Sequence, residues 1–196
     1  TSPSIIIPDL TIQSIDCAGG TGEIQASQTG GTPPFQYSIN GGSLYTSNNI
    51  FSSLLSNTYN IIFRDINNCE VDTNYFLTEP STLSATITVT NPVSCNGEED
   101  ASVITLPTGG TPLYTYVWSG GNAGGQTNAT ANNLSAGTYQ CIIIDANDCQ
   151  DTLSITLIEP DSLLIDSFTV NQISCFGVSD GSIAVHHSGG TPGYTY

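Results

Sequence analysis

Six cysteines are the residues of this sequence with the most evident chemistry, because two thiols can be oxidised to a disulfide. One of them, Cys141, has Ile61 at the matching position of a repeated unit, so we expect a buried free thiol that packs as a small apolar side chain. A catalytic thiol needs exposure and a nearby base, and none is indicated; we expect no catalytic residue and no enzymatic activity. The other five fall into two series spaced by about 80 residues: Cys17, Cys95 and Cys175, and then Cys69 and Cys149.

The pairing of these cysteines depends on how many strands separate them. The first copy contains only Cys17 and Cys69, so pairing within each copy gives Cys17–Cys69 and, by register, Cys95–Cys149. Six strands per copy would place both turns at the same end of the unit, and this pairing is the one we favour. A seventh strand would put the turns at opposite ends, and Cys17 would then lie nearer Cys149 of the next copy. Cys175 is expected to be free or to pair with a cysteine outside residues 161–196.

Carboxylates are the only other candidate ligands. Asp100, Asp145 and Asp148 lie in acidic turns and are weak candidates for calcium, although neither turn has the spacing of a known calcium loop. The adjacent His186 and His187 would face opposite sides of a strand and cannot form a site together. We therefore expect no cofactor, with calcium as the one alternative.

The elements that position these residues are organised around a turn, Gly-Gly-Thr-Pro, which occurs at 30–33, 109–112 and 189–192. The two glycines permit positive φ, and alternating aromatic residues after the proline indicate a strand with one buried face, including Tyr194-Thr195-Tyr196 in the third copy. Self-similarity at this period predicts tandem modules, with limits at 1–80, 81–160 and 161–196, the last being the N-terminal part of a repeat.

Within a copy, short strands separated by turn signals predict an all-β, immunoglobulin-like sandwich of about 80 residues. Trp118 is expected in its core. Tyr139, in Leu134-Ser-Ala-Gly-Thr-Tyr139, is expected to form a tyrosine corner, in which the hydroxyl bonds back to nearby backbone. The alternative for these aromatic residues is a solvent-exposed row that stacks on sugars.

Charge excludes several classes of partner. The chain has 196 residues, one of them basic (Arg64), and a formal net charge of −16. Nucleic acid binding needs a basic footprint, and docking on an anionic membrane does too. No apolar run approaches the roughly 20 residues that span a bilayer, so we expect no direct membrane insertion.

The combined motifs resemble the SprB repeat family of Bacteroidetes surface proteins. The resemblance rests on Cys175-Phe-Gly-Val-Ser-Asp-Gly-Ser-Ile183 with Gly189–Tyr196 and, in the second copy, on Gly109–Tyr116, Leu134–Tyr139 and Asp145–Cys149. The first copy departs from the pattern, because Cys17-Ala-Gly-Gly-Thr-Gly-Glu lacks the Asp-Gly turn.

This resemblance implies large secreted proteins built of tandem modules, exported by the type IX secretion system and displayed on or shed from the outer membrane. Adhesion and gliding motility are the functions it implies. In such a protein Thr152, Ser162 and Ser167 resemble the Asp-Ser/Thr-apolar acceptors of O-glycosylation and are candidate glycosylation sites.

The sequence thus favours a stiff extracellular stalk, a structural segment of an adhesin or filament whose partners are the neighbouring repeats of the same chain. Two alternatives stay open. One is a carbohydrate-binding module that contacts surface glycans, and the other is a filament subunit completed by strands of another subunit.

Overall fold

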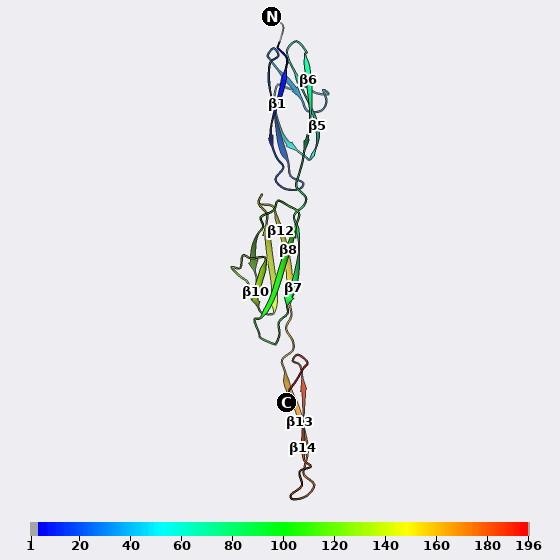
Figure 1. Ribbon diagram of the computed structural model, residues 1–196, viewed down its shortest axis with the longest axis vertical. Coiled ribbons are helices and arrows are strands. Elements are labelled where there is room, and N and C mark those ends of the chain that lie inside the picture. The colour runs from blue at the N-terminus through cyan, green and yellow to red at the C-terminus, as the bar shows by residue number, and fades with distance from the viewer. Residues whose placement is uncertain (1–3, 196) are drawn as a thin grey trace. The chain divides into compact units, whose positions relative to one another are not determined.

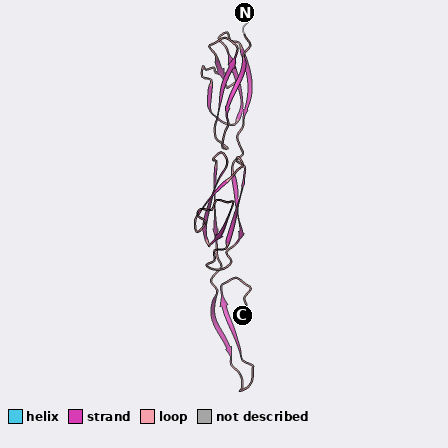
Figure 2. Ribbon diagram, turned by 60° about the vertical axis from the view of Figure 1, so that its left-hand side comes forward, coloured by secondary structure: helices cyan, strands magenta, loops and turns pink. Residues whose placement is uncertain are grey.

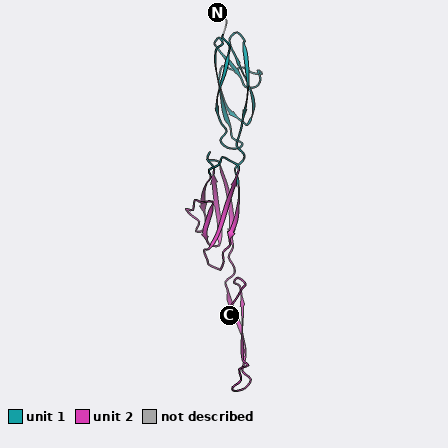
Figure 3. Cartoon of the chain, viewed as in Figure 1, with its two compact units in different colours: residues 1–84, 109–113, 145–149 teal, residues 85–108, 114–144, 150–196 magenta. Residues whose placement is uncertain are grey.

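The computed structural model describes residues 4–195, and its regular elements are all β-strands (Figures 1 and 2). Its contacts divide into two compact units (Figure 3). Unit 1 comprises residues 1–84, 109–113 and 145–149, and unit 2 comprises 85–108, 114–144 and 150–196. The part of the chain that is described has no helix long and apolar enough to cross a membrane. The predicted all-β class is confirmed, whereas domain limits at residues 80 and 160 stay a prediction.

The first copy forms two three-stranded antiparallel sheets with one apolar layer between them. One sheet has the order β1-β2-β4 and the other β3-β5-β6. Alternation along β2 and β5 buries Ile24, Ala26, Ile61 and Phe63, as a half-buried sheet requires. The strands are β1 (Ile7–Gln13), β2 (Gly22–Thr29), β3 (Gln36–Ser38), β4 (Ile50–Leu54), β5 (Asn57–Arg64) and β6 (Glu70–Leu77).

The second copy repeats this order, with sheets β10-β8-β7 and β12-β11-β9. Its core is larger and is centred on Trp118, Tyr139 and Cys141, which are 2%, 0% and 0% exposed. Both the core tryptophan and the buried thiol therefore lie where the strand pattern predicts them. The strands are β7 (Ser84–Asn91), β8 (Ala101–Thr108), β9 (Thr115–Ser119), β10 (Thr130–Leu134), β11 (Gly137–Ile144) and β12 (Gln150–Leu157).

The third copy contributes one hairpin, β13 (Leu164–Asn171) and β14 (Ser182–Ser188). Its inward positions are open: Ile183 is 69% exposed, whereas Val103, at the matching place in the second copy, is 0% exposed. The strand expected at Tyr194-Thr195-Tyr196 does not form at its first two residues, and Tyr196 lies outside the described residues.

The Gly-Gly-Thr-Pro turn has the positive φ expected of it. Its first glycine has φ of 79°, 71° and 69° at Gly30, Gly109 and Gly189. A Cβ at Gly109 would collide with the carbonyl oxygen of Thr82, and the other two glycines approach a carbonyl in the same way. Glycine is therefore required here for two reasons: the positive φ angle, and the close approach of a backbone carbonyl that leaves no room for a Cβ. The turn holds the segment that leads into each copy's first strand.

The segment between the third and fourth strands decides at which end each turn lies. In the first copy β2 and β4 are antiparallel, as are β3 and β5, and only two residues join β4 to β5. It follows that β3 and β4 run in the same direction and finish at the same end of the sandwich. Residues 39–49, which connect them, must therefore run back along its whole length. They do so with isolated bridges, Tyr37 to Thr46 and Asn40 to Asn60.

Because of this return segment, the β1–β2 turn and the β5–β6 turn lie at opposite ends of the first sandwich. The pairing of Cys17 with Cys69 is therefore wrong, and so is the matching pairing of Cys95 with Cys149. Six strands form, as we favoured, but the return segment reverses the chain as a seventh strand would. The thiols of Cys69 and Cys95 are exposed and free.

Candidate functional site

The one disulfide among the described residues joins Cys17 to Cys149 across a sequence separation of 132 residues. Cys17 lies in the turn between β1 and β2, and Cys149 ends the turn between β11 and β12. Their Cα atoms are 5.8 Å apart, within the usual range for a disulfide. Both cysteines belong to unit 1. The alternative pairing, between one copy and the next, is the one that forms.

Asp145 shapes the turn that presents Cys149. Its side chain is 4% exposed, and one carboxylate oxygen accepts from the amides of Asn147 (2.8 Å) and Cys149 (3.0 Å). The other oxygen accepts from the amide of Thr111 at 2.8 Å. The hydrogen bond from Thr111 and then those from Asn147 and Cys149 hold the pKa of Asp145 below its ordinary value, against the opposing effect of burial. The negative charge is thus used to order the turn.

The same carboxylate turn occurs in the first copy. Asp65 accepts from the amides of Asn67 (2.8 Å), Cys69 (2.9 Å) and Thr32 (3.1 Å). Burial, the largest single influence, raises the pKa of Asp65, but the hydrogen bonds from these amides together lower it. Both copies therefore present a cysteine on an Asp-x-Asn-x-Cys turn of one design.

Asn147 is the residue of this site that sequence reasoning missed. Its side-chain nitrogen donates to the backbone carbonyl of Asp16 at 3.0 Å and to the hydroxyl oxygen of Thr111 at 3.1 Å. The side-chain amide of Asn147 thus joins three segments: the 145–149 turn, the residue before Cys17, and the Gly-Gly-Thr-Pro turn that contains Thr111. Its recurrence as Asn67, two residues before the cysteine in both copies, was the signal that could have revealed it.

A glutamate at the end of each copy binds the turn that carries the first cysteine of the same copy. Glu79 accepts from the amide of Gly19 at 2.6 Å, in the turn that carries Cys17. In the same way Glu159 accepts from the amide of Gly97 at 2.7 Å, in the turn that carries Cys95. Each glutamate is followed by a proline, Pro80 or Pro160, and this pair at the end of a copy therefore also fixes a cysteine turn.

The candidate calcium ligands are engaged in local hydrogen bonds. Asp100 accepts from the amide of Ser94 at 3.0 Å, and both oxygens of Asp145 accept from backbone amides. Asp148 has φ of 64° and an exposed side chain. Within residues 4–195 no group of three or more His, Cys, Asp or Glu side chains is placed to hold a metal ion.

The remaining thiols divide by exposure. Cys141 is buried beside Trp118 in the second core, and burial raises the pKa of its thiol. Cys69, Cys95 and Cys175 are exposed. Exposure makes these three available for pairing with another thiol, whereas Cys141 acts as a packing residue.

The three candidate glycosylation residues are all exposed. Thr152 lies on β12 and Ser167 on β13. The hydroxyl of Ser162 donates to the side-chain oxygen of Asn96 at 2.7 Å, in the turn of Cys95. Ser162 thus has a structural partner that Thr152 and Ser167 do not share, and modification of any of them stays a prediction.

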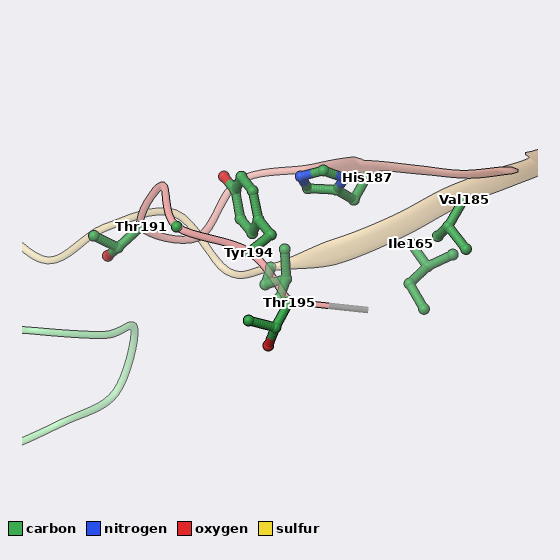
Figure 4. Close-up of a pocket in the computed structure, with 8 residues that line it drawn as sticks. Ile165, Val185, His187, Thr191, Tyr194 and Thr195 are labelled. Carbon is green, nitrogen blue, oxygen red and sulfur yellow. The ribbon is translucent and has the colours of Figure 1, made fainter.

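A pocket of about 340 Å³ lies on the inner face of the third copy's hairpin. Figure 4 shows the ring of Tyr194 next to that of His187, with Ile165 and Val185 further along the strands. The ring centroids of His187 and Tyr194 are 4.0 Å apart. Tyr114, the counterpart of Tyr194 in the second copy, packs against the buried core. The pocket is therefore the open half of a sandwich core.

Two solved structures are similar to this chain. The fold resembles a C-terminal 282-residue fragment of intimin, solved with the intimin-binding domain of its translocated receptor: 14% identity, TM-score 0.45, covering 85% of this chain and 67% of that one. It also resembles murine CEACAM1b: 15% identity, TM-score 0.34, covering 77% of this chain and 100% of that one. No curated protein matches the chain.

The SprB repeat matches the chain at three segments, residues 10–44, 86–123 and 167–196. Together these cover more than half of the sequence, and each runs from within the first strand of a copy through the cysteine turn and the second strand. The chain therefore belongs to the SprB repeat family.

Proposed function

We propose that the chain is a structural segment of a large secreted cell-surface adhesin or filament, in which consecutive repeats are joined covalently into a stiff stalk. The family supports an extracellular setting, and the disulfide agrees with it because disulfides form and persist in oxidising compartments. Export by a type IX system, display on the outer membrane of a Bacteroidetes cell and a part in gliding motility belong to this proposal. No enzymatic step is assigned to the chain.

The observation that carries the proposal is the Cys17–Cys149 disulfide with its surrounding hydrogen bonds. The disulfide and the Asn147 amide both tie the 145–149 turn to the Cys17 turn. A covalent bond and directed hydrogen bonds acting at one place restrict rotation of that turn against residues 1–84. The 131 residues between the two cysteines also lie outside the shortest covalent path through the chain. Tension applied to the ends therefore bypasses most of both sandwiches.

Single-molecule force measurement tests this role. Stretching from the two ends should extend the oxidised chain only outside the disulfide loop. After reduction, or in Cys17→Ser, unfolding should release roughly 130 further residues and thus add about 460 Å at full extension. Cys95→Ser is the matched control and should behave as the unmodified oxidised chain does. Equal extension of oxidised and reduced protein would contradict the mechanical role.

A second candidate function is a filament subunit whose third copy is completed by strands of another subunit. The open apolar face of β13 and β14 favours it, since Ile165, Phe168 and Ile183 are 64%, 61% and 69% exposed. In that case the chain should assemble in a concentration-dependent way, measured by light scattering after gel filtration. Ile183→Asp should abolish the assembly. A strictly monomeric chain would exclude this candidate.

The carbohydrate-binding alternative receives no comparable support. The aromatic residues after the first two Gly-Gly-Thr-Pro turns pack inward, with Tyr37 8% and Trp118 2% exposed. Stacking on sugars needs ring faces open to solvent. Surface glycans therefore remain possible partners of the whole adhesin and are not assigned to a site in this chain.

A further inference from the structure

The turn of Cys95 lies in the same setting as the turn of Cys17, but its thiol is free. Both turns close with the same backbone contact: Gly20 donates to the carbonyl of Cys17 at 2.9 Å, and Glu98 to that of Cys95 at 3.2 Å. Both are held by a glutamate, Glu79 in one and Glu159 in the other. The local hydrogen bonds around the disulfide-bonded Cys17 are thus reproduced around Cys95.

The Gly-Gly-Thr-Pro turn of the following copy is also present at both places. At Cys17, Asn147 links the carbonyl of Asp16 to the hydroxyl of Thr111. At Cys95 the matching residues are Ser94 and Thr191, and they meet directly: the hydroxyl of Thr191 donates to the carbonyl of Ser94 at 3.0 Å. The two groups that an asparagine amide would connect are therefore already together.

The Asp-x-Asn-x-Cys turn is the one component that differs. Around Cys17 it is residues 145–149; around Cys95 the described residues contribute no such turn. A pocket of about 350 Å³ lies there instead. Tyr194 takes part of the space: its ring is 3.4 Å from the Cβ position of Gly190, whereas the nearest atom to that position of Gly110 is a carboxylate oxygen of Asp145. The pocket is lined by Cys95, Asn96, Asp161, Ser162, Leu163, Gly190, Thr191 and Tyr194.

We propose that this pocket is the receptor site for an Asp-x-Asn-x-Cys turn of the following repeat, and that Cys95 forms a disulfide with the cysteine of that turn. The inference rests on the proposed function and specifies the partner of each repeat. The carboxylate of the incoming turn accepts from the amide of Thr191, and its asparagine bridges Ser94 and Thr191. By the same rule Cys69, on the matching turn of the first copy, pairs with a cysteine of a preceding repeat.

The covalent step is a thiol–disulfide exchange. A low-molecular-mass disulfide, RSSR, is the oxidant. One cysteine thiolate attacks it, forming a mixed disulfide and releasing RS⁻; the second thiolate then displaces the other RS⁻ and closes the protein disulfide. Two thiols lose two electrons and two protons, and RSSR becomes two RSH.

The chain's own sequence provides the test. Residues 117–160 are appended after Tyr196, which preserves the 80-residue register because Tyr116 and Tyr196 correspond. The oxidised protein is digested without reduction by a Glu- or Asp-directed protease and mapped by mass spectrometry. The appended segment carries copies of Cys141 and Cys149. Most of Cys95 should be linked to the copy of Cys149, which is the appended cysteine meant below, with Cys17–Cys149 unchanged and the copy of Cys141 left as a free thiol.

Cys175 is the matched internal control, because its turn closes in the same way, with Val178 donating to the carbonyl of Cys175 at 3.2 Å. Linkage of the appended cysteine to Cys175 or Cys69, or its recovery as a free thiol beside an intact Cys17–Cys149 bond, would overturn the inference while leaving the proposed function standing. Loss of Cys17–Cys149 as well would overturn both.

If the appended segment does not fold, a peptide measurement tests the receptor site at Cys95 instead. The peptide Asp-Ala-Asn-Asp-Cys, as a mixed disulfide with a small thiol, is exchanged with the unextended chain. Cys95 should react several-fold faster than Cys175, and replacing the peptide's asparagine by alanine should remove that preference. Equal rates for the two cysteines would reject the receptor site.

Discussion

The two complete copies have the same strand order but fill their cores differently. The core tyrosine shows the difference most directly. Tyr59 and Tyr139 both donate to the carbonyl four residues before them at 2.9 Å. The one hydroxyl hydrogen of Tyr139 is shared with the side-chain oxygen of Asn122 at 2.8 Å, and Tyr139 is fully buried, whereas Tyr59 is half-buried. The backbone contact is thus common to both, and the packing around it is specific to each copy.

The return segment accounts for this contrast. In the second copy residues 120–129 cover the core: Ala123 is 0% exposed, and the Trp118 indole donates to the carbonyl of Asn128 at 2.8 Å. In the first copy the corresponding segment carries Tyr45, which lies outside the core in a surface cluster with Arg64 and Glu70. One fold therefore tolerates either a tryptophan under a covering loop or a smaller core, because the hydrogen-bonded strand framework is the same.

Truncating the central side chain should give the largest difference in stability loss between the two cores. Trp118→Ala removes the largest buried side chain and is expected to destabilise the second sandwich by about 3–5 kcal/mol. Ile39→Ala, at the matching but half-buried position, should cost the first sandwich about 1–2 kcal/mol. Hydrogen exchange by mass spectrometry resolves the two sandwiches in the intact chain. Similar costs at both positions would mean that the cores are equivalent.

The buried thiol gives the next largest effect. Cys141→Ser places a hydroxyl in the buried core and should cost about 1–3 kcal/mol, because a hydroxyl loses more hydration on burial than a thiol does, and a hydrogen bond to the nearby Thr105 side chain offsets that loss only in part. Cys95→Ser makes the same replacement of sulfur by oxygen at an exposed site, and it should change the free energy of unfolding by no more than about 0.5 kcal/mol. Denaturation followed by Trp118 fluorescence reports on this sandwich. An equally mild result for both would show that Cys141 is accessible to solvent.

Removing the tyrosine hydroxyls tests the contact that the copies share. Tyr139→Phe should cost about 1–2 kcal/mol, since it removes the hydroxyl that donates to the carbonyl of Ser135 and to the side-chain oxygen of Asn122. Tyr59→Phe removes one hydrogen bond at a wetter position and should cost about 0.5–1 kcal/mol. Hydrogen exchange of β5 and β11 measures both. A larger loss in the first copy would reverse the proposed importance of burial.

Local pattern predicted the features that depend on a few consecutive residues. The positive φ of Gly30 and Gly109, the strand alternation, the core position of Trp118 and the backbone bond of Tyr139 follow from residue type and period-2 spacing. These features need no knowledge of distant segments. For that reason the sandwich class could be predicted from the sequence.

The disulfide could not be predicted in the same way, because it depends on chain direction. Residues 39–49 have no strand periodicity, yet their return along the sandwich separates Cys17 from Cys69. The role of Asn147 likewise depends on a carbonyl, that of Asp16, 131 residues away. The contact of Glu79 could not be predicted either, since its partner is a backbone amide with no sequence signature.

The smallest expected effect concerns the carboxylate of the cysteine turns and its dependence on pH. Because hydrogen bonds lower the pKa of folded Asp145 below the unfolded value of about 3.9, its stabilisation is complete above that value and is lost as the pH falls through the folded pKa. Asp145→Asn should therefore melt below wild type at pH 7, and the gap should narrow below about pH 4. Asp148→Asn, at an exposed position of the same turn, is the control and should melt close to wild type at pH 7. Scanning calorimetry from pH 7 to acid measures the three proteins, and a gap for Asp145→Asn that persists unchanged in acid would mean that shape, and not charge, makes this residue suited to the turn.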